Sequence, residues 1–224
     1  MNKNFIEVYE NILSEEVCKH LIETFEESPE LQFYGKVGDG GTDPEIKSSS
    51  DLNLLLALDK KAGIKGMILQ NIRQAVDTHV VKYFKKYPYS KLNFTEDSTD
   101  QEVLDNIHTK YSFWSRTLMM KKYNKGKDGF HAFHEDNGKQ FPTAARTLVC
   151  MFYLNDVDKG GETEFYHQDV KIKPTTGSLV IFPAYFTHLH KGHIPISGDK
   201  YIMNIWLQKN NAAFWRIWTN SNNK

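Results

Sequence analysis

The feature that most constrains this chain is a series of eight short apolar segments in its second half. From Tyr111 onward, runs rich in β-branched and aromatic residues alternate with turn-forming segments, which is the pattern of strands rather than helices. The predicted strands are 115–123, 130–134, 146–155, 163–165, 170–173, 178–182, 187–191 and 201–207. Eight short strands in one unbroken series predict a jelly roll, that is, a double-stranded β-helix.

The first half predicts a short strand and several helices. An apolar run at 4–8 favours the strand, and Ser14 is placed to cap a helix that reaches about Glu27. Segments 51–61 and 64–84 predict further helices, because apolar residues in the second recur at spacings of three and four. We therefore expect an α+β, mainly β fold, with these helices packed on one sheet.

Two segments of the first half predict loops. Residues 31–50 are rich in Gly and Ser and indicate a mobile loop, and the polar segment 93–105 indicates a second one. We expect one structural domain with two parts, a helical and strand support at 1–110 and a jelly-roll core at 111–224.

Composition argues against some classes of partner, although a local basic patch stays open. Lys plus Arg and Asp plus Glu both total 28, so there is no global basic field to favour nucleic acid or a membrane surface. No apolar run is long enough to span a bilayer, and the first residues lack a signal-peptide core. Only Cys18 and Cys150 are present, in no metal-like spacing, which is typical of a reducing compartment. These features predict a soluble, cytoplasmic protein.

Histidines gather in the predicted core. Six of the nine lie between His131 and His193. Two imidazoles and one carboxylate on one face are the ligands of mononuclear iron(II) oxygenases, and an HxD pair on a strand supplies two of them because side chains two apart share a face. The chain has two such pairs, His134 with Asp136 and His167 with Asp169. The pattern alone does not decide between them.

A longer series of motifs surrounds the first pair. It contains a Tyr and a Gly before the HxD, an Arg-Thr strand that ends in Tyr-Leu-Asn, Gly-Gly-Glu-Thr-x-Phe, a Pro-x-x-Gly turn, a further His, and Gly-x-Lys before a Trp strand. The residues are Tyr123, Gly126, His134, Asp136, Arg146, Thr147, Tyr153, Leu154, Asn155, Gly160, Gly161, Glu162, Thr163, Phe165, Pro174, Gly177, His190, Gly198, Lys200 and Trp206. In this order they resemble the catalytic core of the prolyl 4-hydroxylase branch of the Fe(II)/2-oxoglutarate-dependent dioxygenases, over about 85 residues.

The resemblance implies which residues bind the metal. Its HxD stands several strands before the second metal His, so His134 and Asp136 fit and His167 does not. The distance to Lys200 favours His190 as the third ligand, while His188 stays open as an alternative ligand or as a residue that orients one. The family's Pro follows this His by four residues, whereas Pro195 follows His190 by five, so we expect a different local turn.

The resemblance also implies the cofactors. These are Fe(II), 2-oxoglutarate as cosubstrate, O2 and, as an auxiliary reductant, ascorbate. Lys200 is expected to hold the distal carboxylate of 2-oxoglutarate, Tyr153 to hydrogen-bond the same carboxylate, and Tyr123 to bond the metal-proximal one. Each tyrosine could equally be a core residue with a satisfied hydroxyl.

The expected reaction is hydroxylation of a prolyl residue in a protein or peptide, with release of succinate and CO2. The family's substrates include collagen-like chains, transcription factors and translation proteins. Arg146 and Trp206 match positions that border the substrate pocket, and 31–50 lies where the family has a loop that folds over peptide. The alternatives are an oxygenase that acts on another side chain or a nucleobase, and a catalytically silent binding module.

Overall fold

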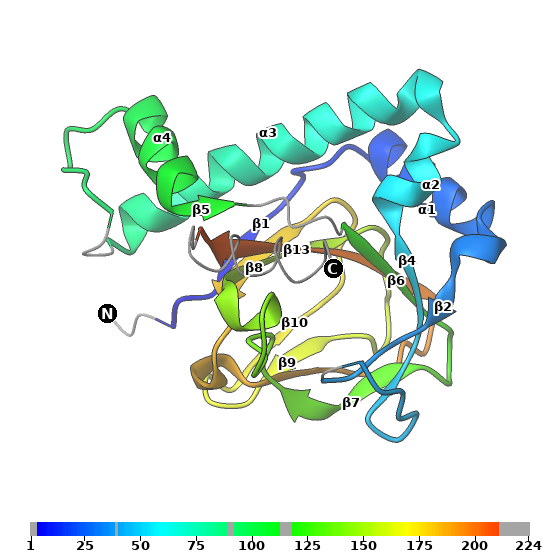
Figure 1. Ribbon diagram of the computed structural model, residues 1–224. Coiled ribbons are helices and arrows are strands. Elements are labelled where there is room, and N and C mark those ends of the chain that lie inside the picture. Colours follow the sequence, from blue (N-terminus) through cyan, green and yellow to red (C-terminus); the bar gives the residue numbers. More distant parts are fainter. Residues whose placement is uncertain (1–3, 39, 89–91, 113–117, 211–224) are drawn as a thin grey trace, which may run out of the picture.

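The computed structural model describes residues 4–38, 40–88, 92–112 and 118–210. Within them, two antiparallel sheets face each other and helices cover the outer face of the larger sheet (Figure 1). The larger sheet has the strand order β1-β11-β8-β13-β6-β4-β2, and β5 pairs with the end of β13. Its strands are β1 (Glu7–Tyr9), β2 (Phe33–Tyr34), β4 (Ser50–Asn53), β5 (Tyr111–Ser112), β6 (Met119–Tyr123), β8 (Arg146–Tyr153), β11 (Leu179–Pro183) and β13 (Lys200–Lys209).

The smaller sheet has the strand order β10-β9-β12-β7-β3. Its strands are β3 (Lys47–Ser48), β7 (Gly129–His134), β9 (Thr163–Phe165), β10 (Val170–Ile172) and β12 (His190–Gly192). Both sheets combine strands from distant parts of the sequence, since β3 and β4 flank a single residue yet pair with β7 and β6 respectively. The N-terminal part, expected as support, therefore contributes strands to both sheets.

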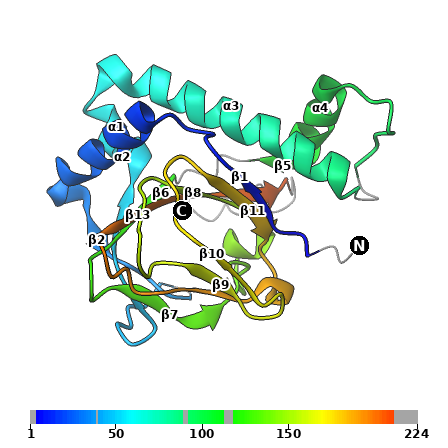
Figure 2. The same cartoon turned by 180° about the vertical axis from the view of Figure 1, so that it is seen from behind.

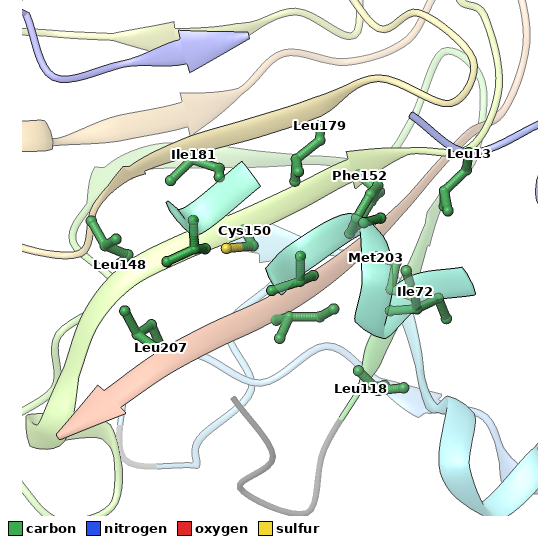
Figure 3. Packing of buried hydrophobic residues seen from close by; sticks show 14 of the residues in the cluster. Leu13, Ile72, Leu118, Leu148, Cys150, Phe152, Leu179, Ile181, Met203 and Leu207 are labelled. Atoms are coloured by element: carbon green, nitrogen blue, oxygen red, sulfur yellow. The ribbon is translucent and has the colours of Figure 1, made fainter. Parts of the chain in front are cut away.

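The central strands of the larger sheet are buried on both faces. On β8, Cys150 and Phe152 face the helices, whereas Val149 and Met151 face the smaller sheet, as the alternation of side chains along a strand requires. The same division separates Met203 from Ile202 on β13. Figure 3 shows Met203 beside Ile72, with Phe152 and Cys150 further along the same cluster. Burial on two faces explains why these strands are almost continuous apolar runs.

The helices form one layer. They are α1 (Glu15–Glu26), α2 (Leu54–Asp59), α3 (Ala62–Lys86) and α4 (Asp100–Lys110). The long α3 crosses the larger sheet, with α1 and α2 near its start and α4 near its end (Figures 1 and 2). Ser14 caps α1 by accepting a hydrogen bond from the Val17 N–H, as the sequence predicts. None of the helices in the described residues is both long enough and apolar enough to cross a bilayer.

Most predicted elements of the core are confirmed, with shifts at their ends. The exception is 187–191, predicted as one strand. A short 3-10 helix (Phe186–His188) occupies its first part, and β12 begins only at His190. Residues 113–117 of the first predicted strand lie outside the described residues.

Three predictions for the first half are wrong in part. The polar segment 93–105 was expected as a loop, but α4 begins at Asp100 because Thr99 and Glu102 form a capping box. Segment 51–61 begins as strand β4, and its helix α2 starts only after Asn53, which caps it. The expected loop 31–50 contains β2 and β3, whose backbone groups pair with β4 and β7.

Truncation of the shared core strand β8 tests this architecture. Phe152 is fully buried, so Phe152→Ala should lower the free energy of unfolding by about 3–5 kcal/mol. Leu56→Ala is the control, because Leu56 is 53% exposed and its loss should change stability by no more than about 0.5 kcal/mol. Urea unfolding measures both. Similar losses in the two variants would contradict the described core.

Candidate metal centre

Strand pairing brings three predicted residues of the site together. In the smaller sheet, His190 of β12 is the direct partner of His134 at the end of β7. Asp136 follows β7 by two residues. One ligand atom from each of His134, Asp136 and His190 lies within 4.8 Å of the others. Among the described residues this is the one group of three or more His, Cys, Asp or Glu that could hold a metal ion.

Both imidazoles of the group are oriented by backbone carbonyls. His134 Nδ1 lies 3.3 Å from the Ala132 oxygen, and His190 Nδ1 lies 3.0 Å from the His188 oxygen. Since a carbonyl oxygen only accepts, each Nδ1 carries a hydrogen, and Nε2 is the ring nitrogen left to face a metal. An imidazole held in this way is the usual form of a metal-ligating histidine.

The carboxylate of Asp136 has an unsatisfied oxygen. Its Oδ2 is buried without a hydrogen-bond partner and lies 3.4 Å from His190 Nε2. Burial alone would raise the pKa of Asp136, but the contact with His190, followed by the electrostatic effects of the surrounding His190, His134 and Arg146 side chains, holds that pKa below its ordinary value. A buried anionic oxygen close to two imidazoles fits a divalent cation.

His134 is also in the form that metal binding requires. Burial, and next the neighbouring His190, hold the pKa of His134 well below its ordinary value. The imidazole is therefore neutral near pH 7, as a metal ligand must be. Its ring stacks on Phe130 with the ring centroids 3.4 Å apart.

Arg146 and Trp206 stand beside this group. Arg146 Nη1 donates to the Asp136 carbonyl oxygen at 3.1 Å, and the guanidinium carbon lies 3.8 Å from the centroid of the Trp206 ring. Both line a pocket of about 590 Å³ that also contains His134 and Asp136. Residues Phe33, Lys36, Val37 and Gly38, from the segment predicted as a lid, line the same pocket.

Lys200 lies in a separate part of the interior. It is 2% exposed, and its Nζ donates to the Gly161 oxygen at 2.8 Å. Gly161 has φ of +76°, a backbone conformation that favours glycine. The Lys200 ammonium also lies 4.9 Å from the centroid of the Tyr123 ring. The Tyr153 hydroxyl donates to Thr163 Oγ1 at 2.6 Å. Lys200, Tyr123 and Tyr153 do not line the 590 Å³ pocket.

The two rival histidines lie elsewhere. The ring nitrogens of His188 contact Thr187 Oγ1 and the Asn4 oxygen, both at 2.9 Å. His188 orients His190 through its backbone carbonyl rather than through its ring. His167 is exposed and is not part of the three-residue group.

Sequence reasoning missed two polar residues of the interior. Lys121 of β6 lines the pocket and is only 8% exposed. It stands two residues before Tyr123 and so shares its face of the strand, a signal that was available. Asn204 of β13 is buried, and its Oδ1 has no hydrogen-bond partner.

Comparisons with known proteins agree with this geometry. Residues 118–208 match the family model of the 2OG-Fe(II) oxygenase superfamily. A protein of Acanthamoeba polyphaga mimivirus, named "Putative prolyl 4-hydroxylase", is 32% identical over 72 residues, which are 29% of this chain and 30% of the viral protein. The match thus spans less than a third of that relative's length.

Solved prolyl hydroxylases share the fold. A viral collagen prolyl hydroxylase from Paramecium Bursaria Chlorella virus-1, in complex with 2-oxoglutarate, aligns over 91% of this chain and 96% of its own, with TM-score 0.60 and 19% identity. A Trichoplax adhaerens prolyl hydroxylase, in complex with a hypoxia inducible factor peptide, covers 92% and 84%, with TM-score 0.65 and 17% identity. A Pseudomonas putida prolyl-4-hydroxylase covers 92% and 93%, with TM-score 0.52 and 13% identity.

These findings confirm the resemblance to prolyl 4-hydroxylases inferred from the motifs. They also confirm Fe(II), 2-oxoglutarate and O2 as the expected cofactors, because the superfamily match coincides with a His-Asp-His group. The use of ascorbate stays a prediction.

Metal binding tests the three-residue group. His134→Ala should lower the affinity for Mn(II), a redox-stable substitute for Fe(II), by more than about 100-fold, since losing a ligand costs more than losing a residue that orients one. Calorimetric titration measures this. His167→Ala is the matched control from the rival HxD pair, and it should leave the affinity unchanged. Equal losses in the two variants would place the metal elsewhere.

Proposed function

We propose that this chain is an Fe(II)/2-oxoglutarate-dependent oxygenase that hydroxylates a prolyl residue of a protein or peptide, with release of succinate and CO2. The observation that carries the proposal is the buried Oδ2 of Asp136, which has no hydrogen-bond partner and stands in one group with the imidazoles of His134 and His190. The group opens onto a pocket large enough for part of a peptide. The relatives named above as prolyl hydroxylases support this choice of substrate.

The fold in this proposal is the double-stranded β-helix expected from the sequence. Its support is a pair of facing antiparallel sheets whose inner side chains form a common apolar cluster, with Val149 and Trp206 from the larger sheet and Phe165 from the smaller one. The proposed metal ligands stand at the edge of that cluster, where Phe165 and Phe182 contact the His190 ring.

In this proposal His134, Asp136 and His190 hold the iron, which activates O2 together with 2-oxoglutarate and supplies the oxidising chemistry. Lys200 holds the distal carboxylate of 2-oxoglutarate. Its ammonium is buried with one carbonyl partner, so an incoming carboxylate compensates its charge. Tyr123 borders Lys200, and Tyr153 releases Thr163 if it bonds the cosubstrate.

The pocket is the proposed substrate site. Arg146 and Trp206 form one wall, and the 31–50 segment contributes Phe33 and Val37 to another. This placement supports a lid role for the segment, because residues of the lid would touch bound peptide directly. Arg146 also holds the Asp136 backbone, so it links the substrate wall to the metal group.

Product analysis tests the proposal. The purified chain, supplied with Fe(II), ascorbate and 2-oxoglutarate, should release succinate, and Asp136→Ala should not. Proteins of a host lysate treated with the enzyme should gain one oxygen on proline, as detected by mass spectrometry. Oxygen on lysine or on nucleobases would overturn the prolyl assignment. Absence of both succinate and metal-dependent 2-oxoglutarate binding would indicate a silent binding module.

Removal of the Lys200 charge should weaken cosubstrate binding. Lys200→Met keeps most of the side-chain volume but leaves the distal carboxylate unpaired, at a cost of about 2–5 kcal/mol, so the dissociation constant for 2-oxoglutarate should rise by about 30-fold or more. Calorimetry with Mn(II)-loaded protein measures it. Lys125→Met, at an exposed lysine, is the control. An unchanged constant for Lys200→Met would exclude this anchor.

The same lysine predicts a pH dependence. Burial, with a smaller contribution from Lys121 and against the opposing effect of Glu162, lowers the pKa of Lys200 to about 7. A bound carboxylate raises it again, so binding takes up a proton above pH 7 and the affinity for 2-oxoglutarate should fall by up to tenfold per pH unit as pH rises from about 7. Titrations in buffers of different ionisation enthalpy measure the proton. Lys200→Arg should bind without this dependence, because guanidinium stays charged. A wild-type affinity that is constant between about pH 6.5 and pH 8.5 would contradict the prediction.

A further inference from the structure

Lys121 is a buried cation that the proposed reaction does not use. It lies at the centre of β6, lines the pocket beside the metal group and is 8% exposed. Its Nζ lies 5.7 Å from the centroid of the Trp206 ring. Across the described ranges its ammonium makes no ion pair or hydrogen bond, and it faces the pocket rather than being fully enclosed. The chain therefore presents an unpartnered positive charge inside its own pocket.

An unpartnered ammonium is costly to bury. Burial first, and then the charge of Lys47, lower the pKa of Lys121 to about 8, against the opposing effects of Asp51 and Asp136. Lys121 is still mostly charged at pH 7. Lys47, which lines the same pocket, is stabilised in the usual way by a carboxylate, since its Nζ donates to Asp51 Oδ2 at 2.7 Å. A lysine that keeps its charge without such a partner is suited to an anionic group from outside.

The charges of the pocket lining leave an excess of cations. Lys47 is paired with Asp51, and Arg146 with Asp136. Lys36, Lys121 and Lys139 also line the pocket, and none has a carboxylate within 4.0 Å in the part of the chain that the structure describes. The remaining carboxylate of the lining, Glu135, is exposed. A peptide that fills this pocket brings its own negative charge or leaves Lys121 desolvated.

The cosubstrate does not supply this charge in the proposed arrangement. Lys200 pairs with Tyr123 across the strands, and its ammonium lies against Gly161. Lys121 pairs with Ile202, and its ammonium lies towards Trp206, on the substrate wall. The two ammonium groups thus lie in different parts of the interior. That of Lys121 lies in the part that Arg146 and Trp206 line.

We propose that Lys121 receives the carboxylate of an acidic residue in the substrate, next to the prolyl residue that is hydroxylated. This rests on the proposed function and adds a specificity-determining contact to it. Lys36 and Lys139 at the exposed side of the pocket favour the approach of the same acidic segment. The substrate class is thus a proline-containing peptide with Asp or Glu close to the proline.

Peptide binding tests the inference without turnover. Fluorescent peptides with one central proline carry Glu at one of the positions one to three residues to either side, and each has a twin with Gln there. Mn(II)-loaded protein with 2-oxoglutarate should bind the Glu peptide about tenfold more tightly at one position, equivalent to about 1.4 kcal/mol. Lys121→Met should remove that preference, and Lys121→Arg should keep it.

The matched control is Lys122→Met. Lys122 lies on the opposite face of the same strand, where it pairs with Glu26, so this variant should keep the preference for Glu. Thermal unfolding of each variant shows whether it folds, and the wild-type comparison of Glu with Gln peptides needs no variant.

The inference is wrong if the Glu and Gln peptides bind equally well at every position, or if neither binds. It is also wrong if the preference for Glu persists in Lys121→Met. Binding of a single-stranded oligonucleotide that depends on Lys121 would assign the charge to a phosphate instead. Peptides with Ala in place of proline separate the two proposals. If these bind with the same Glu preference, the acidic contact stands and the prolyl assignment fails. If succinate assays show prolyl turnover without a Glu preference, only the contact fails.

Discussion

The pairing of β7 with β12 is the constraint on which the site depends. It sets His190 directly opposite His134, although 55 residues separate them in the sequence. β12 is only three residues long, but β9 pairs with its other edge and places Phe165 opposite His190. The rings of Phe165 and Phe182 then fix the imidazole from the interior. A shift of one residue in this register would turn His190 to the other face and remove a ligand.

The larger sheet supplies the rigidity behind this pairing. Because β8 and β13 are buried on both faces, the helix layer holds one face while the other lines the interior. That inner face carries polar atoms without partners, namely Thr147 Oγ1, Asn204 Oδ1 and Trp206 Nε1. Buried polar groups are usually satisfied. Their grouping with Asp136 Oδ2 indicates an interior shaped for polar ligands rather than for closest packing.

The sequence predicted local structure better than long-range pairing. The strands of the core were predictable because strands that are buried on both faces consist of nearly continuous apolar residues. The short strands β2 and β3 were not, since two residues carry no periodicity and only their partners make them strands. α4 was not predicted, although Thr99 and Glu102 have the sequence spacing of a capping box. For the site, motif order selected His134 over His167, and the distance to Lys200 favoured His190 over His188. The structure adds that the His188 ring contacts Asn4, whereas its backbone carbonyl orients His190.

Three buried lysines show what sequence alone leaves undecided. Lys47, Lys121 and Lys200 are all less than a tenth exposed. Motif order singled out Lys200, but the sequence did not distinguish the other two. Their partners among the described residues do, since Lys47 has a carboxylate, Lys200 a carbonyl oxygen, and Lys121 only the face of an indole. A carboxylate partner makes a lysine structural, because its charge is already neutralised. The charge of a buried lysine with a weaker partner is not neutralised, so an anionic ligand can still stabilise it. Whether a lysine of this interior is structural or is proposed to bind a ligand therefore depends on whether the fold already pairs its charge with a carboxylate.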